Sequence, residues 1–414
     1  MSIIYADNNA TTAIAREVYE AMIPYLTEDY FNPSSMYEPA RRTAQAVTAA
    51  RGTVARFFGE IDPREILFTA CATESNNAAI AGTAQANPRR RHIVTTAVEH
   101  PAVLEVCKEM QRNGFEVTFL PVDRSGGLDV REFIRALRPD TLLVSVMHAN
   151  NETGVVFPIE QLSRITKETG AGIVFHTDAT QTVGKVPIRL DREFAHVDLL
   201  SFSGHKLHAP KGIGVLFVRR AIPWRPWMIG GHQEEGRRAG TENVPYVIGL
   251  AKAVQLAAEN LEDETTRIAG LRDRLELGIL ERIPFVEVNG RGAPRLPNTL
   301  NVACHFIEGE GILYQLSEHG ICASSGSACT SGSLEPSHVL RAMNVPLTAI
   351  QGSVRFSFSR YNTRQDVERI LEVFPSIVAN LRRLSPYWDN QKNIPRPAAE
   401  AMLSASGPRS GLSP

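Results

Sequence analysis

The alternation of short apolar runs with amphipathic stretches constrains the fold of this chain more than any other sequence feature. Apolar-rich runs that predict strands occur at residues 66–69, 92–95, 117–120, 142–147, 173–175, 199–202 and 215–218. Stretches with helical periodicity lie between several of them, at residues 41–58, 103–112, 129–137 and 159–169. Nearly continuous apolar strands that alternate with helices indicate a parallel sheet with both faces covered. The preference for right-handed crossovers then predicts a doubly wound layer.

The pattern changes near Pro245. A long helical stretch at residues 247–280 is followed by shorter strand-like and helical segments, the last of which is a helix at residues 363–384. We therefore expect a large α/β domain at residues 13–258 and a smaller α+β domain formed by residues 1–12 and 259–388. Residues 389–414 are rich in Pro, Ser and Ala, which predicts a disordered tail.

The composition of the 414 residues is that of an ordinary globular protein, and the formal net charge is −1. This balance argues against bulk attraction to nucleic acid or to a membrane surface. No run approaches the roughly 20 apolar residues of a membrane helix, and residues 1–12 do not resemble a signal peptide. The five cysteines form no CxxC pair, which argues against a disulfide framework or a zinc knuckle. We expect a cytoplasmic protein with reduced thiols.

Two charged residues follow predicted strands. Lys206 comes after the strand at residues 199–202, and Asp178 comes after the strand at residues 173–175. Ligands of doubly wound sheets bind beyond the carboxyl ends of the strands, where a lysine can form a Schiff base and a carboxylate can pair with a pyridinium nitrogen. Each residue also has an ordinary interpretation, because Lys206 can be a surface lysine and Asp178 a helix N-cap.

The segment from Ala70 to Glu74 follows another predicted strand and opens a helix. A helix N-terminus at this place can bind an anion, and Thr73 adds a hydroxyl group. A plain capping turn is the alternative. The chain contains neither a P-loop motif nor a dinucleotide-binding glycine motif in this context.

Cys329 lies inside a run of Ser, Gly, Ala and Thr at residues 324–333. A loop of small residues exposes a cysteine more often than it packs one, which favours a reactive thiol over a buried one. Zinc binding by His205, His208 and Cys329 is an alternative, but the three residues lack the spacing of a metal site.

These motifs together resemble a known family. The chain is similar to the class V, fold-type I enzymes that use pyridoxal phosphate (PLP), and among them to the cysteine desulfurases of the NifS/IscS type. The matching segments are residues 5–12, 32–35, 99–104, 149–154, 201–206, 237–243 and 324–343. The resemblance covers nearly all of residues 5–388, and residues 97–101 and 236–243 lean toward the nitrogen-fixation (NifS) branch.

The resemblance implies a reaction in which sulfur moves from L-cysteine to the enzyme and leaves L-alanine. Lys206 would hold the cofactor as a Schiff base, and His100 would stack on its ring and move protons. Arg355 and Asn32 would hold the substrate carboxylate. Cys329 would be the nucleophile that becomes a persulfide.

The resemblance also assigns residues to cofactor binding. They are Ala72, Thr73, Asn151, Asp178, Gln181, Ser203, His205, Lys206 and Thr241. Asp178 would pair with the ring nitrogen, Gln181 and Asn151 would lie near the ring hydroxyl, and Thr241 would reach the phosphate from the other subunit of a homodimer. No metal is expected in the free enzyme, and Cys329 is the residue considered as a ligand to a nascent iron–sulfur cluster.

The implied partner is an iron–sulfur scaffold protein of the NifU kind, which would accept the sulfur for cluster assembly in nitrogenase. A selenocysteine lyase or another PLP lyase, and a catalytically silent assembly scaffold, are the alternatives. One departure from the family is the phosphate turn, where Ala70-Cys71-Ala72-Thr73 stands in place of a glycine-containing turn.

Overall fold

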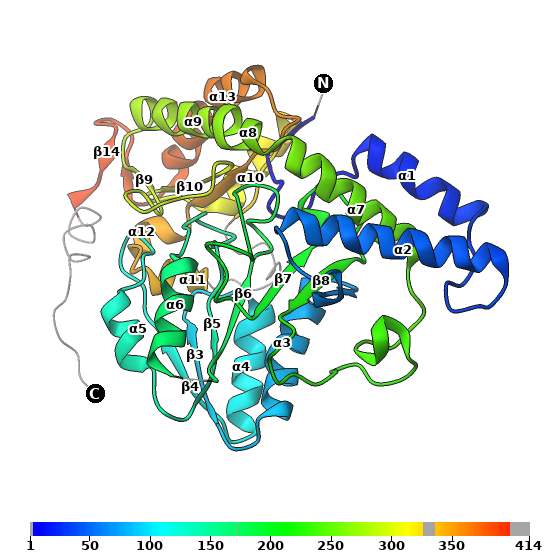
Figure 1. The fold of residues 1–414 in the computed structure, drawn as a ribbon. Coiled ribbons are helices and arrows are strands. Elements are labelled where there is room, and N and C mark those ends of the chain that lie inside the picture. The colour runs from blue at the N-terminus through cyan, green and yellow to red at the C-terminus, as the bar shows by residue number, and fades with distance from the viewer. Residues whose placement is uncertain (1–2, 171, 326–335, 398–414) are drawn as a thin grey trace.

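The structure is a computed structural model, and it describes residues 3–170, 172–325 and 336–397. A seven-stranded sheet forms its centre (Figure 1), and the order of the strands is β2-β8-β7-β6-β5-β3-β4. The strands are β2 (Ile66–Thr69), β3 (His92–Thr96), β4 (Glu116–Leu120), β5 (Thr141–Ser145), β6 (Val174–Asp178), β7 (Leu199–Ser203) and β8 (Gly214–Val218). Every strand predicted for this sheet from the apolar runs is confirmed in place.

The sheet is mostly parallel, as the fold class implied by the resemblance requires, and β8 is the exception. β8 is antiparallel to both of its neighbours, β7 and β2, whereas the other paired strands are parallel. Only residues 204–213 connect β7 to β8, and the one helix among them is the short 3₁₀ turn Gly204–Lys206. Because a parallel return needs a longer crossover, usually an α-helix, the chain can only turn back.

Helices cover both faces of the sheet. Alternate side chains of each strand point to opposite faces, so that Phe68, Phe202 and Phe217 join one apolar cluster while Leu67, Leu199 and Leu216 join another. The first cluster includes residues of α1 (Arg16–Thr27), α2 (Glu38–Phe57), α5 (Val130–Ala136), α6 (Ile159–Thr169) and α7 (Val244–Glu259). The second includes residues of α3 (Ala72–Ala86) and α4 (Pro101–Arg112).

A smaller sheet has its own apolar cluster and the strand order β12-β10-β9. Its strands are β9 (Val286–Val288), β10 (Thr299–Cys304) and β12 (Ser353–Ser357). The helices α9 (Ala269–Arg282), α10 (Gly309–Glu318) and α13 (Arg364–Leu384) contribute to this cluster. Near it, β1 (Ile4–Tyr5) pairs with β11 (Ile321–Cys322), so the N-terminal residues lie with the C-terminal third of the chain. Two short helices, α11 (His338–Ala342) and α12 (Leu347–Ile350), pack instead against the cluster of the large sheet.

The helical stretch predicted at residues 247–280 is not one helix. It consists of α7, the single turn α8 (Leu261–Asp263), a π-helical turn at Glu264–Ile268, and α9. α7 ends at Glu259, and the side-chain amide of the C-cap residue Asn260 donates to the carbonyl of Leu256 at 2.7 Å. Asparagine is a poor helix former because its side chain competes for backbone hydrogen bonds in this way, and apolar periodicity does not reveal it.

The chain remains folded beyond Trp388 as far as it is described, which corrects the predicted start of the tail at residue 389; residues 398–414 of that prediction lie outside the described residues. The strands β13 (Trp388–Asp389) and β14 (Ile394–Pro395) form a small hairpin. Trp388 is buried against Phe285, Phe306 and the Arg382 guanidinium. This aromatic cluster anchors the hairpin to the smaller sheet. No helix in the described part of the chain is long and apolar enough to cross a membrane.

Candidate active site

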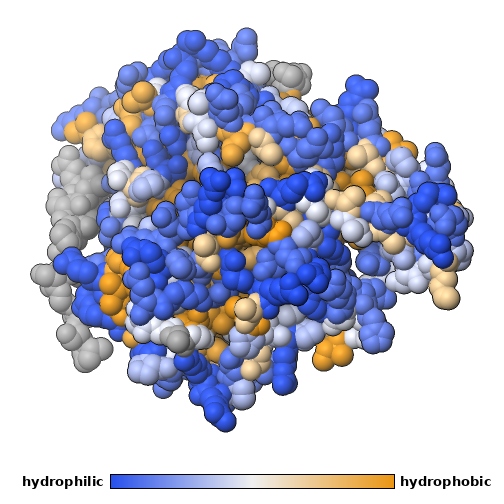
Figure 2. Space-filling model, viewed as in Figure 1, coloured by the Kyte–Doolittle hydropathy of each residue, from blue (hydrophilic) through white to orange (hydrophobic). Residues whose placement is uncertain are grey.

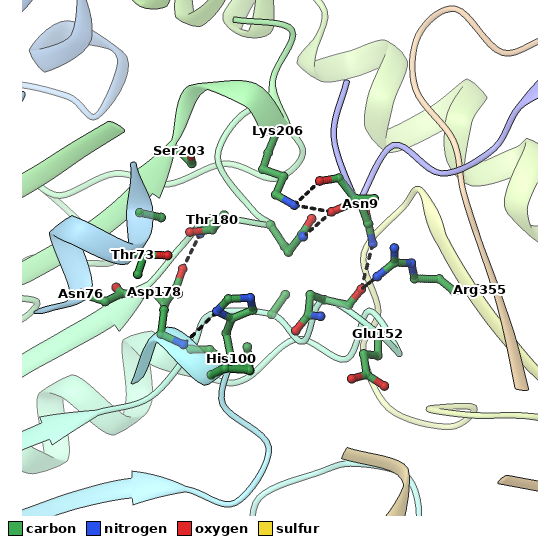
Figure 3. Close-up of a pocket in the computed structure, with 18 of the residues that line it drawn as sticks. Asn9, Thr73, Asn76, His100, Glu152, Asp178, Thr180, Ser203, Lys206 and Arg355 are labelled. Atoms are coloured by element: carbon green, nitrogen blue, oxygen red, sulfur yellow. Dashed lines mark hydrogen bonds between the residues drawn. The ribbon is translucent and has the colours of Figure 1, made fainter. Parts of the chain in front are cut away.

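A cavity of about 520 Å³ opens at the edge of the large sheet where its parallel strands end (Figure 3). The residues after β2, β3, β5, β6 and β7 all reach it, because parallel strands bring their carboxyl ends to one edge. The predicted site residues that line it are Ala72, Thr73, His100, Asn151, Asp178, Gln181, Ser203, His205, Lys206 and Arg355. The structure therefore brings together ten residues that are spread over most of the sequence.

Lys206 enters the cavity from the 3₁₀ turn that follows β7. Its Nζ donates hydrogen bonds to the backbone carbonyls of Asn9, at 2.5 Å, and Ala10, at 2.8 Å (Figure 3). These carbonyls belong to the N-terminal segment, which is anchored elsewhere by β1. The lysine amine is thus held at a defined place in the cavity.

Asp178 is the last residue of β6 and is buried. Its Oδ1 accepts a hydrogen bond from the backbone N–H of Thr180 at 2.9 Å, and its Oδ2 accepts one from Asn76 Nδ2 at 2.7 Å. The two donors fix the plane of the carboxylate at the cavity wall. A carboxylate held in this way can receive a further hydrogen bond from a protonated ring nitrogen.

Hydroxyl groups without a partner mark the wall near β7. The Oγ of Ser203 and the Oγ1 of Thr180 are buried and have no hydrogen-bond partner in the protein, although both residues line the cavity. Ala72 and Thr73, which line the same cavity, form the first turn of α3, whose leading N–H groups lack partners within the helix. Donors that converge on one place at a helix N-terminus form a site for a phosphate.

Three histidines of the described chain line the cavity, and for two of them, His100 and His205, the surroundings favour the neutral form. Burial lowers the pKa of His100, and burial followed by the charge of Lys206 lowers the pKa of His205 to about 4. The Nδ1 of His100 accepts a hydrogen bond from the backbone N–H of Ala102 at 3.1 Å, so the ring proton lies on Nε2. His100 also begins α4 as its N-cap, which fixes the ring at the cavity.

Asn9 connects the site to the smaller sheet, and the sequence motifs did not single it out. Its side-chain amide donates to Thr299 Oγ1 at 2.8 Å, and its Oδ1 accepts from Asn298 Nδ2 at 3.0 Å. Its backbone carbonyl accepts from Gln181 Nε2 at 3.1 Å as well as from Lys206. The sequence analysis also missed Asn76 and Thr180. Both donate a hydrogen bond to Asp178, and the hydroxyl of Thr180 has no partner in the protein; only the fold reveals these contacts.

Arg355 on β12 supplies the cavity with a buried cation. Its guanidinium donates to the backbone carbonyl of Asn151 at 2.9 Å and to Asp7 Oδ1 at 2.8 Å, and its Nε has no partner. An arginine that keeps a donor unpaired inside a cavity is suited to bind a carboxylate.

Two of the predicted residues, Asn32 and Thr241, lie outside the cavity, and a third falls outside the described residues. Asn32 is exposed and uses its side chain to accept a hydrogen bond from the backbone of Ser34 at 2.9 Å. Thr241 is exposed near the start of α7, and neither residue lines the cavity. Cys329 lies outside the described residues, but Ser337 and His338, shortly after it in sequence, line the cavity.

Glu152 lies in the matching segment 149–154, but the resemblance assigned it no role; it is buried at the cavity wall. Its Oε2 accepts a hydrogen bond from the Oγ of Ser337 at 2.5 Å, and Ser337 in turn caps α11. Burial raises the pKa of Glu152 to about 7. His338 is fixed nearby by a 2.9 Å contact between its Nε2 and the carbonyl of Glu99. These contacts hold the start of α11 at the cavity.

The donor set fits PLP. The unpaired hydroxyls and the helix N-terminus suit its phosphate, the Asp178 carboxylate suits its ring nitrogen, and the amine of Lys206 suits its aldehyde. A metal would need a different set, and no cluster of three or more His, Cys, Asp or Glu residues suited to hold one is found in the described ranges.

Comparison with known proteins agrees with this geometry. Residues 4–370 match the model of the family described as aminotransferase class-V. The chain is 54% identical over 402 residues to a protein of Trichormus variabilis named cysteine desulfurase 2, which covers 97% of this chain and all of the relative. It is 50% identical over 397 residues to the cysteine desulfurase NifS of Azotobacter vinelandii, covering 96% of this chain and 98% of that protein.

Among solved structures, one described as a NifS-like protein superposes with a TM-score of 0.85 at 38% identity, covering 92% of this chain and all of that one. The predicted fold class, a mostly parallel sheet between helices in the manner of fold-type I, is thereby confirmed. The match across nearly the full length, together with a cavity whose donors fit the cofactor, means that this chain belongs to the aminotransferase class-V family of PLP-dependent enzymes, within its cysteine desulfurase group.

Proposed function

We propose that this enzyme is a cysteine desulfurase that converts L-cysteine to L-alanine and transfers the sulfur to the thiol of Cys329. The observation that carries the proposal is the convergence of Lys206, Asp178 and Arg355 on one cavity. The names of relatives 50–54% identical to the chain support it. The reaction is balanced, because cysteine and the enzyme thiol become alanine and the enzyme persulfide.

The residues divide the work by their chemistry. When bound, PLP supplies an electron sink for the negative charge that develops at the substrate Cα. The cation of Arg355 orients the substrate by its carboxylate, and the amine of Lys206 removes the Cα proton. The Nε2–H of His100 is a donor that can return a proton. Cys329 attacks the substrate sulfur, so that the C–S bond breaks as the S–S bond forms.

The proposal is tested by incubating the purified enzyme with L-cysteine and measuring alanine and sulfide with and without a reductant. Equal amounts of alanine and enzyme persulfide are expected without a reductant, and sulfide release is expected when one is added. Formation of pyruvate and ammonia in place of alanine would refute the desulfurase assignment and favour another lyase.

Replacing Asp178 with asparagine is expected to slow turnover by about 10²–10⁴-fold, since electrostatic and proton-transfer contributions have this size. The amide keeps the shape of the side chain but lacks the charge that pairs with a protonated ring nitrogen. Steady-state alanine release measures the effect, and Asp178→Glu, which retains the charge, should recover part of the rate. Wild-type kinetics in Asp178→Asn would mean that Asp178 only organises the turn after β6.

We further propose a homodimer in which Thr241 reaches the cofactor phosphate of the partner subunit. Two ion pairs hold the segment that precedes Thr241, between Arg51 and Glu234 at 2.6 Å and between Arg238 and Glu74 at 2.8 Å. Exposed hydrophobic residues lie before this segment, at Trp227, Met228 and Ile229. Figure 1 shows the segment as an excursion between β8 and α7, and Figure 2 shows a largely hydrophilic face with smaller hydrophobic areas.

Light scattering is expected to give twice the mass of the chain. Thr241→Ala should weaken PLP affinity by about tenfold or more, the value of one hydrogen bond to a charged group. Thr265→Ala provides the matched control, because Thr265 is an exposed helical threonine whose hydroxyl binds only its own helix. A monomer that holds PLP with normal affinity would contradict the dimer.

The remaining assignments extend the same proposal. We propose that the persulfide sulfur passes to an iron–sulfur scaffold of the NifU kind, in the cytoplasm, for nitrogenase assembly; the similarity to NifS supports this role. We also propose that residues 13–258 form the cofactor-binding domain and that residues 1–12 and 259–388 form the domain that carries Cys329. The separate apolar clusters of the two sheets support this division.

A further inference from the structure

Lys185 is a buried lysine behind the active site to which the reaction assigns no role. It lies in the turn that follows β6 and is only 6% exposed. Its Nζ donates to Gln181 Oε1 at 3.0 Å and to Asn9 Oδ1 at 3.4 Å. Lysine is almost never fully buried unless it is paired, so this placement needs a reason.

The ammonium group determines which way the amide of Gln181 points. Because the ammonium form of a lysine can only donate, protonated Lys185 requires the oxygen of Gln181 to face it and the NH₂ group to face the other side. On that side, Nε2 donates to the carbonyl of Asn9, and Gln181 lines the cavity. Lys185 thus orients the side chain of Gln181 so that its NH₂ group, and not its carbonyl oxygen, is on the cavity side.

The same contacts reach the amine of Lys206. The carbonyl of Asn9 accepts from both Gln181 and Lys206, and the side chain of Asn9 accepts from Lys185. Lys185 is therefore connected to Lys206 through two routes that meet at Asn9. Removing its ammonium group would leave Gln181 Oε1 without this donor. Asn9 Oδ1 would lose one of its two hydrogen bonds and keep the one from Asn298.

A counter-charge lies on the far side of Lys185. Glu264 belongs to the π-helical turn between α8 and α9, a rare geometry often found at functional sites. Glu264, Lys185 and Lys206 line a second, smaller cavity of about 20 Å³, which is large enough for one water molecule. Burial lowers the pKa of Lys185 to about 7 and raises the pKa of Glu264 to about 7. The other charged or titratable groups that act on this pair or respond to it are Lys206, Arg355, Arg360, Asp263, Arg267, His205 and His208.

We propose that Lys185 is a positioning residue, which turns the donor of Gln181 toward the ring hydroxyl of PLP and fixes the carbonyl of Asn9 against Lys206. The inference rests on the proposed binding of PLP in the larger cavity. It concerns a residue that contacts neither substrate nor cofactor and acts through its neighbours.

Lys185 is expected to lower the pKa of the nitrogen that joins Lys206 to the cofactor in two ways. A donor to the ring oxygen stabilises its negative charge and withdraws electron density from the nitrogen that joins Lys206 to the cofactor. A cation near Lys206 also disfavours a proton on that nitrogen. Both lower the pH at which the nitrogen loses its proton, so removing Lys185 should raise that pH.

The experiment is a pH titration of the visible absorbance of the PLP-loaded enzyme without substrate. In Lys185→Met the midpoint should rise by about one pH unit, which corresponds to a tenfold change in proton affinity. Lys185→Arg keeps the charge and the donors and should stay close to the wild type. Lys167→Met is the matched control, because Lys167 is a half-buried lysine that pairs with Asp198 and does not line either cavity.

A wild-type midpoint in Lys185→Met, with full PLP occupancy, would overturn the inference. If the methionine variant does not fold, Lys185→Gln and Lys185→Arg decide the question: a raised midpoint in the glutamine variant alone supports positioning, and equal midpoints overturn it. Absence of visible absorbance from the wild type would refute PLP binding itself, and the inference with it.

Discussion

Replacing Lys206 with alanine is expected to abolish turnover and to remove the visible absorbance of the PLP-bound enzyme. The amine of Lys206 lies at the end of β7, inside the cavity, where the carbonyls of Asn9 and Ala10 hold it. Alanine leaves neither a nitrogen to bond the cofactor nor a base for the Cα proton. A positioned base alone contributes about 10²–10⁴ in rate, and the loss of the covalent link to PLP adds to that.

Absorbance spectra and alanine release measure the two losses separately. The matched control is Lys211→Ala, because Lys211 is an exposed lysine in the same connection between β7 and β8 and does not line the larger cavity. It should retain both properties. The assignment of Lys206 would be wrong if Lys206→Ala kept the absorbance and released alanine at the wild-type rate.

The success of the sequence analysis at this site has a simple physical origin. A strand of the central sheet is a short, nearly continuous apolar run, so its end can be read from the sequence to within about three residues. Asp178 and Lys206 follow two such ends, and parallel strands bring their ends to one edge. The position of both residues in one cavity therefore followed from local patterns and one general rule. The family resemblance supplied the roles of His100 and Arg355, which no local pattern indicates.

The parts that could not be predicted depend on long-range contacts. Asn9 is an ordinary polar residue in sequence, and it becomes central only because it meets Gln181, Lys206 and Asn298 in space. The pairing of Lys185 with Gln181 is of the same kind. The antiparallel direction of β8 depends on the short length of the connection from β7. The end of α7 before Asn260 depends on a side-chain hydrogen bond, which the apolar periodicity of the sequence does not indicate.

The largest remaining effect is expected for Cys329. Cys329→Ala should still bind PLP and cysteine, and the absorbance should still change when cysteine is added. It should release no alanine and acquire no persulfide, because the C–S bond cannot break without an acceptor for the sulfur. Mass spectrometry of the protein and alanine release are the measurements. Alanine release at the wild-type rate would show that Cys329 is not the acceptor. If Cys329→Ala turned over selenocysteine but not cysteine, only the reaction with cysteine would need the thiol.

The surroundings of the other cysteines argue against most of them as the sulfur acceptor in place of Cys329. Burial raises the pKa of Cys107 and of Cys304 to about 12, so neither forms the thiolate that attacks sulfur at neutral pH. Cys322 is partly buried where β11 pairs with β1 and does not line the cavity. Cys71 does line it, beside the turn that suits the phosphate. Cys71→Ala is therefore the decisive control: it should transfer sulfur normally, and a loss equal to that of Cys329→Ala would place the acceptor in the phosphate turn.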